Sequence, residues 1–252
     1  VYNSFVYSSM SAENARLLTK KEINIISNQQ NLYDQALVAL MFIQQAQIAK
    51  ESGDLDRADI MLENAASILA AIDSHDVLYK SNLEQIIVTG EILWVGIAAT
   101  QYKLVSEGST QFDALIAKVD KHIDMFYRNA GFIYGRADEN WVSTEHILDA
   151  IGYYNLKLYC DKKYGSSVDF NVQNRLYALS SYLYKELYDK DNKTFYRGRY
   201  DKYHVLDTCS WGVQVLAMVE YMNPELFEYG LNGELYLKSI DIYALLDYAE
   251  NH

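Results

Sequence analysis

Apolar residues recur every three or four positions along almost the whole chain, and this spacing places them on one face of an α-helix. The single proline among 252 residues also favours long helices, because proline interrupts helix interiors. The pattern predicts helices over residues 33–50, 58–72, 92–98, 112–126, 144–163, 169–188, 207–219 and 235–250.

Local signals mark several helix ends. A Ser or Thr followed three residues later by Glu forms a capping box, and this motif occurs at residues 19–22 and 81–84. Asp207 is expected to cap the helix that follows it, and Gly165 is expected to end the preceding long helix. Pro224 is expected at the first position of a further helix.

The predicted helices form α-hairpins. Short glycine turns join the two helices of a pair, whereas longer connections join one pair to the next. These longer connections would emerge at one end of the fold, where repeat proteins carry their binding surface. The chain is therefore expected to be all-α, with helix pairs at residues 33–72, 86–127, 144–188 and 207–250.

Two of the long connections, residues 128–143 and 189–206, share a pattern of aromatic residues and glycine. Residues 131–135 (GFIYG) in the first resemble residues 194–198 (TFYRG) in the second. Short runs of this kind, bounded by turn residues, predict a β-ribbon in each connection.

Charge excludes several classes of partner. The formal net charge is −12 and no Lys/Arg cluster is present, so no nucleic-acid partner is expected. The same sign disfavours anionic membranes, and no window approaches the ~20 apolar residues of a membrane span. The chain begins at Val1 rather than Met, which fits an exported (extracellular or periplasmic) protein and equally a piece of a longer chain.

Motifs for cofactors and metals are not found. Cys160 and Cys209 belong to no CxxC pair and are predicted to be buried free thiols, although a disulfide between them stays open. Residues 189–194 (DKDNKT) lack the glycine and glutamate of an EF-hand and are predicted to form a solvated turn. Without a P-loop, GxGxxG, GxSxG or HExxH motif, we expect neither a cofactor nor a metal site.

One segment concentrates chemically useful side chains. Residues 141–149 (WVSTEHILD) combine a tryptophan, two carboxylates, an imidazole and two hydroxyls at the start of a predicted helix. Aromatic rings beside titratable groups are typical of clefts that bind sugars, because the apolar ring faces complement the C–H faces of the sugar.

Four segments occur in an order that resembles the bacterial six-hairpin, glycosidase-like (α/α) toroid proteins. They are residues 33–37 (YDQAL), Trp94, residues 141–150 (WVSTEHILDA) and residues 206–212 (LDTCSWG). The resemblance implies that these segments line one central cleft.

The resemblance also implies a single α/α-toroid domain over residues 1–252. The family has six hairpins and this chain shows about four. Either an N-terminal helix near residues 5–28 and further chain complete the ring, so that the sequence is a fragment, or the fold is an open arc. Such an arc would expose apolar helix faces and require further chain or a partner chain to cover them.

Glycoside hydrolysis needs two carboxyl groups that flank the scissile bond. Glu145, close behind Trp141, is the candidate general acid, for which a raised pKa is required. The candidate bases are Asp34 and Asp207, each near the start of an apolar helix. Either aspartate could instead serve only its helix N-terminus, through the helix dipole or as a cap.

Seven further residues are candidate substrate contacts. Four are aromatic and could stack on sugar rings, whereas Trp94 is expected in the core. Asp149 lies deeper in its helix and would need a buried partner, which His146 or a tyrosine of the cleft could supply. The candidates are Tyr33, Glu91, Tyr134, Trp141, His146, Asp149 and Trp211.

These observations favour an inverting glycoside hydrolase, or a lyase-like relative, that acts on an oligo- or polysaccharide. One alternative is a non-catalytic carbohydrate-binding or scaffold toroid, which Ile147 favours because the family has Asn there. The other is a helical-repeat adaptor for peptides. Residues 55–58 (LDRA) after Gly53 resemble such a repeat turn, but the helix pairs are longer than its 34-residue unit.

Overall fold

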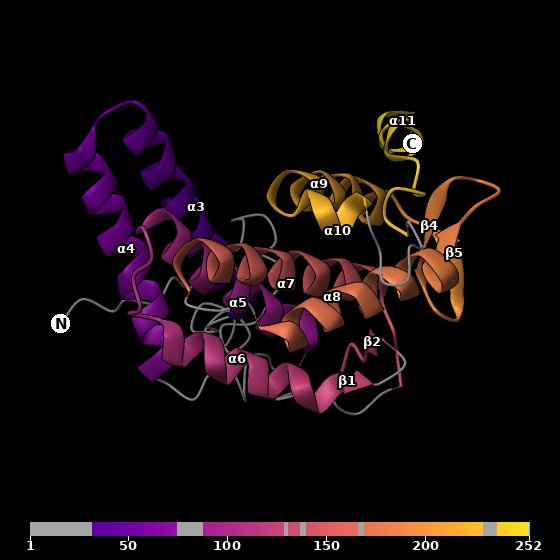
Figure 1. Ribbon diagram of the computed structural model, residues 1–252, viewed down its shortest axis with the longest axis horizontal. Helices are drawn as coiled ribbons and strands as arrows, with labels where there is room; N and C mark the ends of the chain where they lie inside the picture. The colour runs from indigo at the N-terminus through magenta and orange to yellow at the C-terminus, as the bar shows by residue number, and fades with distance from the viewer. Residues whose placement is uncertain are drawn as a thin grey trace, which may run out of the picture. The chain divides into compact units, whose positions relative to one another are not determined.

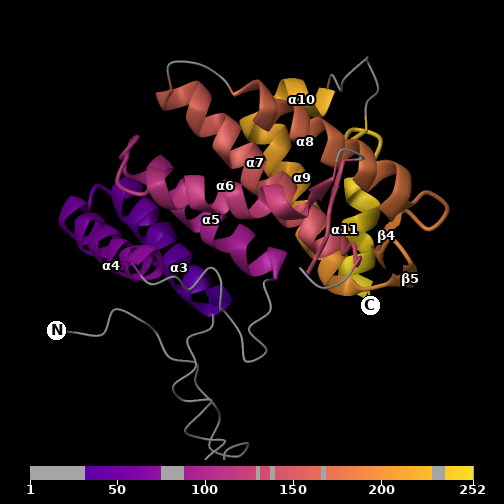
Figure 2. The same cartoon turned by 90° about the horizontal axis from the view of Figure 1, so that it is seen from below.

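Long helices carry most of the chain in the computed structural model (Figures 1 and 2). The structure describes residues 32–74, 88–128, 131–136, 140–165, 169–228 and 236–251. The two predicted capping boxes, at residues 19–22 and 81–84, and the N-terminal helix near residues 5–28 lie outside these ranges. The chain divides into two compact units, Val1–Val119 and Asp120–His252.

The first unit contains an α-hairpin, as predicted for residues 33–72. Helix α3 (Leu32–Glu51) packs against both α4 (Leu55–Ser74) and α5 (Thr89–Val105). Gly53 has a φ of +79° in the α3–α4 turn, a conformation that glycine adopts without a steric penalty. The buried contacts are made largely by small and branched apolar residues, among them Ala36, Ala39, Ile43, Ala65, Leu69 and Ile92.

The second unit is built around one central helix. Helix α7 packs against α8 and α9, and α9 packs against α11, so the pairs predicted at 144–188 and 207–250 are confirmed. The helices are α7 (Thr144–Tyr164), α8 (Phe170–Tyr182) with a π-helical turn (Leu183–Leu187), α9 (Leu206–Met222), α10 (Pro224–Glu228) and α11 (Ile242–Asn251).

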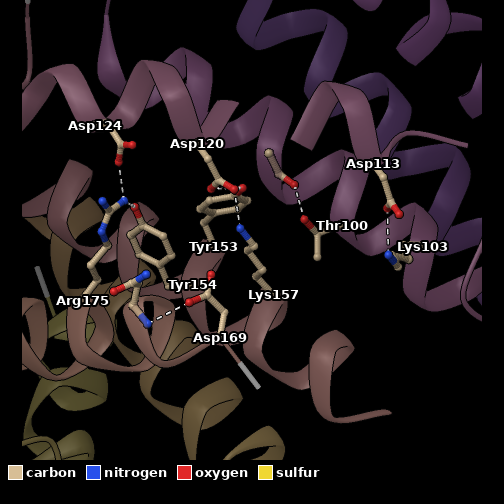
Figure 3. A network of polar contacts seen from close by, with 12 residues as sticks. Thr100, Lys103, Asp113, Asp120, Asp124, Tyr153, Tyr154, Lys157, Asp169 and Arg175 are labelled. Atoms are coloured by element: carbon tan, nitrogen blue, oxygen red, sulfur yellow. Dashed lines mark hydrogen bonds and ion pairs between the residues drawn. The ribbon is translucent and has the colours of Figure 1, made fainter. Parts of the chain in front are cut away.

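Helix α6 (Asp113–Phe126) ends in the second unit, where polar contacts tie it to α7 and α8 (Figure 3). The Tyr153 hydroxyl donates to Asp120 at 2.8 Å. Arg175 pairs with Asp124 at 2.6 Å and donates to the Tyr154 hydroxyl at 2.9 Å. Burial raises the pKa of both tyrosines, so these rings enter the core with neutral hydroxyls that have hydrogen-bond partners.

Both predicted β-ribbons are present. Strands β1 (Tyr127–Arg128) and β2 (Phe132–Ile133) pair antiparallel in the first connection. The second connection forms a three-stranded antiparallel sheet in the order β3 (Tyr188–Asp189), β4 (Thr194–Gly198) and β5 (Asp201–His204).

Two helix starts differ from the prediction. Asp207 is not the cap of α9: the helix begins at Leu206, and Val205 is the N-cap residue with extended backbone angles. The reason is that β5 leads into the helix without an intervening turn, which puts Asp207 inside the first helical turn. The last helix begins at Ile242 rather than near 235, and Asp241 Oδ1 accepts a hydrogen bond from the Ala244 amide at 3.0 Å at its start.

Two helical glycines offer a matched test of the packing in the second unit. A Cβ at Gly212 of α9 would lie 2.5 Å from the ring of buried Phe195, whereas one at Gly152 of α7 would meet nothing closer than Met218 at 3.5 Å. We expect Gly212→Ala to lower the free energy of unfolding by about 1–3 kcal/mol through overpacking. Gly152→Ala should raise it by up to about 1 kcal/mol through helix propensity. Urea unfolding of both variants measures the difference, and equal effects would contradict the packing described.

Candidate functional site

The start of α7 is held by the β4–β5 hairpin. Ser143 forms a β-bridge with Gly198, and the Arg199 amide donates to the Val142 carbonyl at 3.0 Å. A Cβ at Gly198 would lie 2.6 Å from that carbonyl oxygen, so the close approach requires glycine. The two long connections with the shared aromatic–glycine pattern thus meet at the segment that the sequence singled out. Gly198 closes the segment 194–198 that the shared pattern picked out, whereas Arg199 follows that segment and no feature of the sequence distinguished it.

A second glycine shapes the wall of the site. The Gly135 amide donates to the Trp141 carbonyl at 2.7 Å, and a Cβ there would come within 2.4 Å of the Trp141 ring. The Trp141 ring meets the His146 ring edge to face, with centroids 5.1 Å apart, and leaves 39% of its surface exposed. Gly135 and His146 therefore hold the indole in place, and its exposed part can contact a ligand.

Glu145 lies in the first turn of α7, and its side chain reaches solvent. Partial burial raises the pKa of its carboxyl, and the negative charge of Asp207 raises it further. Asp207 occupies the corresponding first turn of α9, where its Oδ1 accepts a hydrogen bond from the Thr208 amide at 2.7 Å. Two carboxyls from neighbouring helix starts therefore share one electrostatic environment.

Asp149, one turn deeper in α7, is 1% exposed. Its Oδ1 accepts a hydrogen bond from the Trp211 indole at 2.9 Å, which joins α7 to α9 beneath the two carboxyls. Trp211 is thus a partner of this buried acid, for which the sequence suggested His146 or a tyrosine. The contact fixes the half-buried Trp211 ring in one orientation.

His146 lies beneath the surface of the site, 6% exposed. Burial lowers the pKa of its imidazole to about 4, so the ring is neutral at physiological pH. Its Nδ1 atom has no hydrogen-bond partner among the residues that the structure describes.

The remaining candidates are placed as follows. Tyr134 follows β2 and lies edge-on to Phe132, with ring centroids 5.3 Å apart. Tyr33, Asp34 and Glu91 belong to the first unit, at the starts of α3 and α5. The Tyr33 ring meets the half-buried ring of Trp94 edge to face at 5.6 Å, in agreement with a packing role for that tryptophan.

Metal-binding clusters of His, Cys, Asp or Glu do not occur within the described part of the chain. Both cysteines are buried free thiols, as predicted. The predicted solvated turn at 189–194 is exposed at residues 190–193, but Asp189 is buried, and its carboxylate accepts hydrogen bonds from Asn192 and contacts His204. Its oxygens are thereby occupied by protein groups.

Within the described ranges, no helix has both the length and the apolar composition that a bilayer-spanning segment needs.

Neither a protein-family model nor a curated protein matches the sequence, but solved structures match the fold. One is an inactive variant of an α-1,6-mannanase of family 76 from a Salegentibacter species, in complex with α-1,6-mannotriose. It is 12% identical, with a TM-score of 0.63, over 86% of this chain and 61% of that chain. Another is a family 76 glycoside hydrolase from a bovine Bacteroides thetaiotaomicron strain, 8% identical, with a TM-score of 0.62, over 87% of this chain and 47% of that one.

A third match is a sugar epimerase from a ruminal bacterium, 14% identical, with a TM-score of 0.54, over 75% of this chain and 57% of that chain. The chain thus spans between 47% and 61% of the length of these three structures. At such identities a likeness establishes the fold and not the chemistry. Over the part of their length that it covers, the chain has the (α/α)-toroid fold of these carbohydrate-active enzymes.

Proposed function

We propose that this chain hydrolyses a glycosidic bond of an oligo- or polysaccharide, with Glu145 as the general acid and Asp207 as the base. In an inverting reaction the protonated acid gives its proton to the leaving oxygen while the base activates water on the opposite face of the sugar. Trp141, with its exposed ring face, would carry the sugar beside Glu145.

One observation carries the proposal: Glu145 and Asp207 lie in the first turns of two helices that pack together, where burial raises the pKa of Glu145 and the charge of Asp207 raises it further. A general acid must hold its proton near neutral pH, and a second carboxylate close by is one of the means of achieving this. A carboxyl at a helix N-terminus with no other task would be favoured in its charged form by the helix dipole.

The mannanase of similar fold offers a comparison for the position of the two acids. Its inactive variant replaces two consecutive aspartates by asparagines. The present sequence contains no two consecutive aspartates. The acid pair proposed here therefore comes from two helices of the second unit, α7 and α9.

A non-catalytic binding role draws less support from the structure. The sequence favoured that role because Ile147 stands where the family has Asn. Ile147 is 0% exposed, so this replacement changes the interior of the second unit and not an exposed wall.

Asp207→Asn tests the coupling between the two carboxyls. Removing the negative charge should lower the pKa of Glu145, and activity that needs its protonated form should then disappear at a lower pH. We expect the alkaline limb of the kcat/KM profile for mannooligosaccharide cleavage to move to lower pH, together with a loss of rate if Asp207 is the base.

Glu220→Gln on α9 is the matched control. It removes the same charge from an exposed position thirteen residues along the helix, ~20 Å from Asp207 at 1.5 Å per residue, beyond the range of unscreened interaction at ordinary salt. Its pH profile should match the wild type. An alkaline limb that does not move in Asp207→Asn would remove Asp207 from the proposed pair.

A further inference from the structure

The β4–β5 hairpin carries three cationic side chains in a strongly acidic protein. Arg197 forms an ion pair with Asp201. Lys202 donates to the Glu186 carbonyl at 3.2 Å. Arg199 differs from both, because none of the described residues offers its guanidinium a carboxylate or another hydrogen-bond acceptor.

Aromatic rings hold the Arg199 side chain instead. Its guanidinium carbon lies 5.4 Å from the centroid of Phe132 and 5.1 Å from the centroid of Tyr200, which is 80% exposed. Contacts with ring faces orient the guanidinium and leave its N–H groups, five donors in a fixed plane, for other partners.

A buried hydroxyl lies in the same cluster. Tyr182 is 7% exposed, and its hydroxyl has no hydrogen-bond partner in the described parts of the chain. Its ring centroid is 5.2 Å from that of Phe132, the ring that Arg199 also contacts. Burial raises the pKa of Tyr182 to about 12, and the positive charge of Arg199 acts in the opposite direction, so the two polar groups influence one another.

The cluster adjoins the start of α7. The Arg199 amide is bonded to the Val142 carbonyl, and Val142 precedes Glu145 by three residues, a chain length of at most ~11 Å. A sugar residue next to the one handled by Glu145 would thus reach the neighbourhood of Arg199.

We propose that Arg199 and Tyr182 bind an anionic group, a carboxylate or a phosphate, on a sugar residue adjacent to the bond that Glu145 cleaves. The planar guanidinium matches either anion with two parallel hydrogen bonds, and the hydroxyl supplies a third donor. The exposed Tyr200 ring provides a face on which the same sugar can stack. This inference rests on the proposed function and names its substrate class as an acidic glycan.

Calorimetric titration with three trisaccharides tests the proposal: α-1,6-mannotriose, its 6-phosphate monoester, and the corresponding trisaccharide with mannuronic acid. The wild type should bind an anionic trisaccharide about tenfold to a hundredfold more tightly than the neutral one, as expected for a charge-assisted hydrogen bond. Comparing the phosphate and the carboxylate identifies which anion the cluster takes. Arg199→Gln should abolish the preference, and Tyr182→Phe should reduce it without altering the ring.

Arg197→Gln is the matched control, because it removes an equal charge from the same hairpin at a residue already paired with Asp201. It should retain the preference. Equal binding of all three trisaccharides to the wild type, no binding of the anionic ones, or an equal loss in Arg197→Gln would each overturn the inference. Titration of Glu145→Gln, together with a cleavage assay of the wild type, separates the anion site from the proposed function. Preference for the anionic trisaccharides without cleavage by the wild type would contradict the hydrolase. Cleavage without that preference would contradict only the anion site.

Discussion

Glu145→Gln is expected to lower kcat for polysaccharide cleavage by about 10²–10⁴-fold, the range that a positioned general acid contributes. Glutamine preserves the size and hydrogen-bonding shape of the side chain but carries no transferable proton. Substrate binding should change little, since Trp141 and the hairpin keep their positions. Reducing-end release from mannooligosaccharides and calorimetric binding of the same ligands measure the two effects separately.

A substrate with a good leaving group sharpens this test. A 4-nitrophenyl glycoside releases 4-nitrophenolate, an anion stable enough to leave without being protonated, so Glu145→Gln should lose much less rate on this substrate than on an unactivated polysaccharide. An equal loss on both substrates would indicate that Glu145 positions the sugar and does not protonate it. Unchanged cleavage of the polysaccharide would exclude Glu145 from the chemistry.

The same variant should be slightly more stable than the wild type at neutral pH. The pKa of Glu145 in the folded protein is raised above its ordinary value of 4.5, so folding opposes ionisation of this carboxyl. The stability of the folded state therefore declines as the pH rises from 4.5 through the folded pKa. Because the carboxyl is partly solvated, the gain from glutamine is on the order of a few tenths of a kcal/mol. A gain in stability together with a loss of activity would show that the variant has lost catalysis and not its fold.

Much of the helical framework followed from sequence because its helices bury one apolar face at helical spacing. The hairpin α3–α4 and the pairs in the second unit depend only on local turns and on that spacing, so periodicity was enough to predict them. The helix starts that were wrong, at Asp207 and near residue 235, depend on neighbours distant in sequence. Strand β5 delivers the chain directly into α9, and a capping preference at Asp207 gives no sign of this.

The candidate site shows the same division. The motif at residues 141–149 pointed to Glu145, and the shared aromatic–glycine pattern indicated that the two connections were alike. Neither could reveal that Asp149 is bonded to Trp211, or that Arg197 pairs with Asp201 while Arg199 meets no carboxylate among the described residues. Those properties arise from tertiary contacts between residues that the sequence presents as equivalent.

The buried imidazole of His146 should make the stability of the folded protein strongly dependent on pH below neutrality. Its imidazole has a pKa of about 4 when folded and 6.5 ordinarily, because burial disfavours the charged form. Between these values the unfolded chain binds a proton that the folded chain does not, so stability is full above pH 6.5 and declines as pH falls toward 4. The expected loss across this window is about 3 kcal/mol.

The variant His146→Gln isolates this contribution. It should be less stable than the wild type at pH 7, where it loses the ring contact with Trp141, but its stability should fall less on acidification. Urea unfolding of both proteins between pH 7 and pH 4.5 gives the two slopes, and their difference removes the carboxyl groups that both share. Parallel slopes, or an imidazole that titrates near pH 6.5 by NMR, would contradict the buried neutral ring. A shallower slope in the variant would identify His146 as the group through which acid destabilises the packing around Trp141, since a charged imidazole would be buried with an Nδ1 atom that has no hydrogen-bond partner among the described residues.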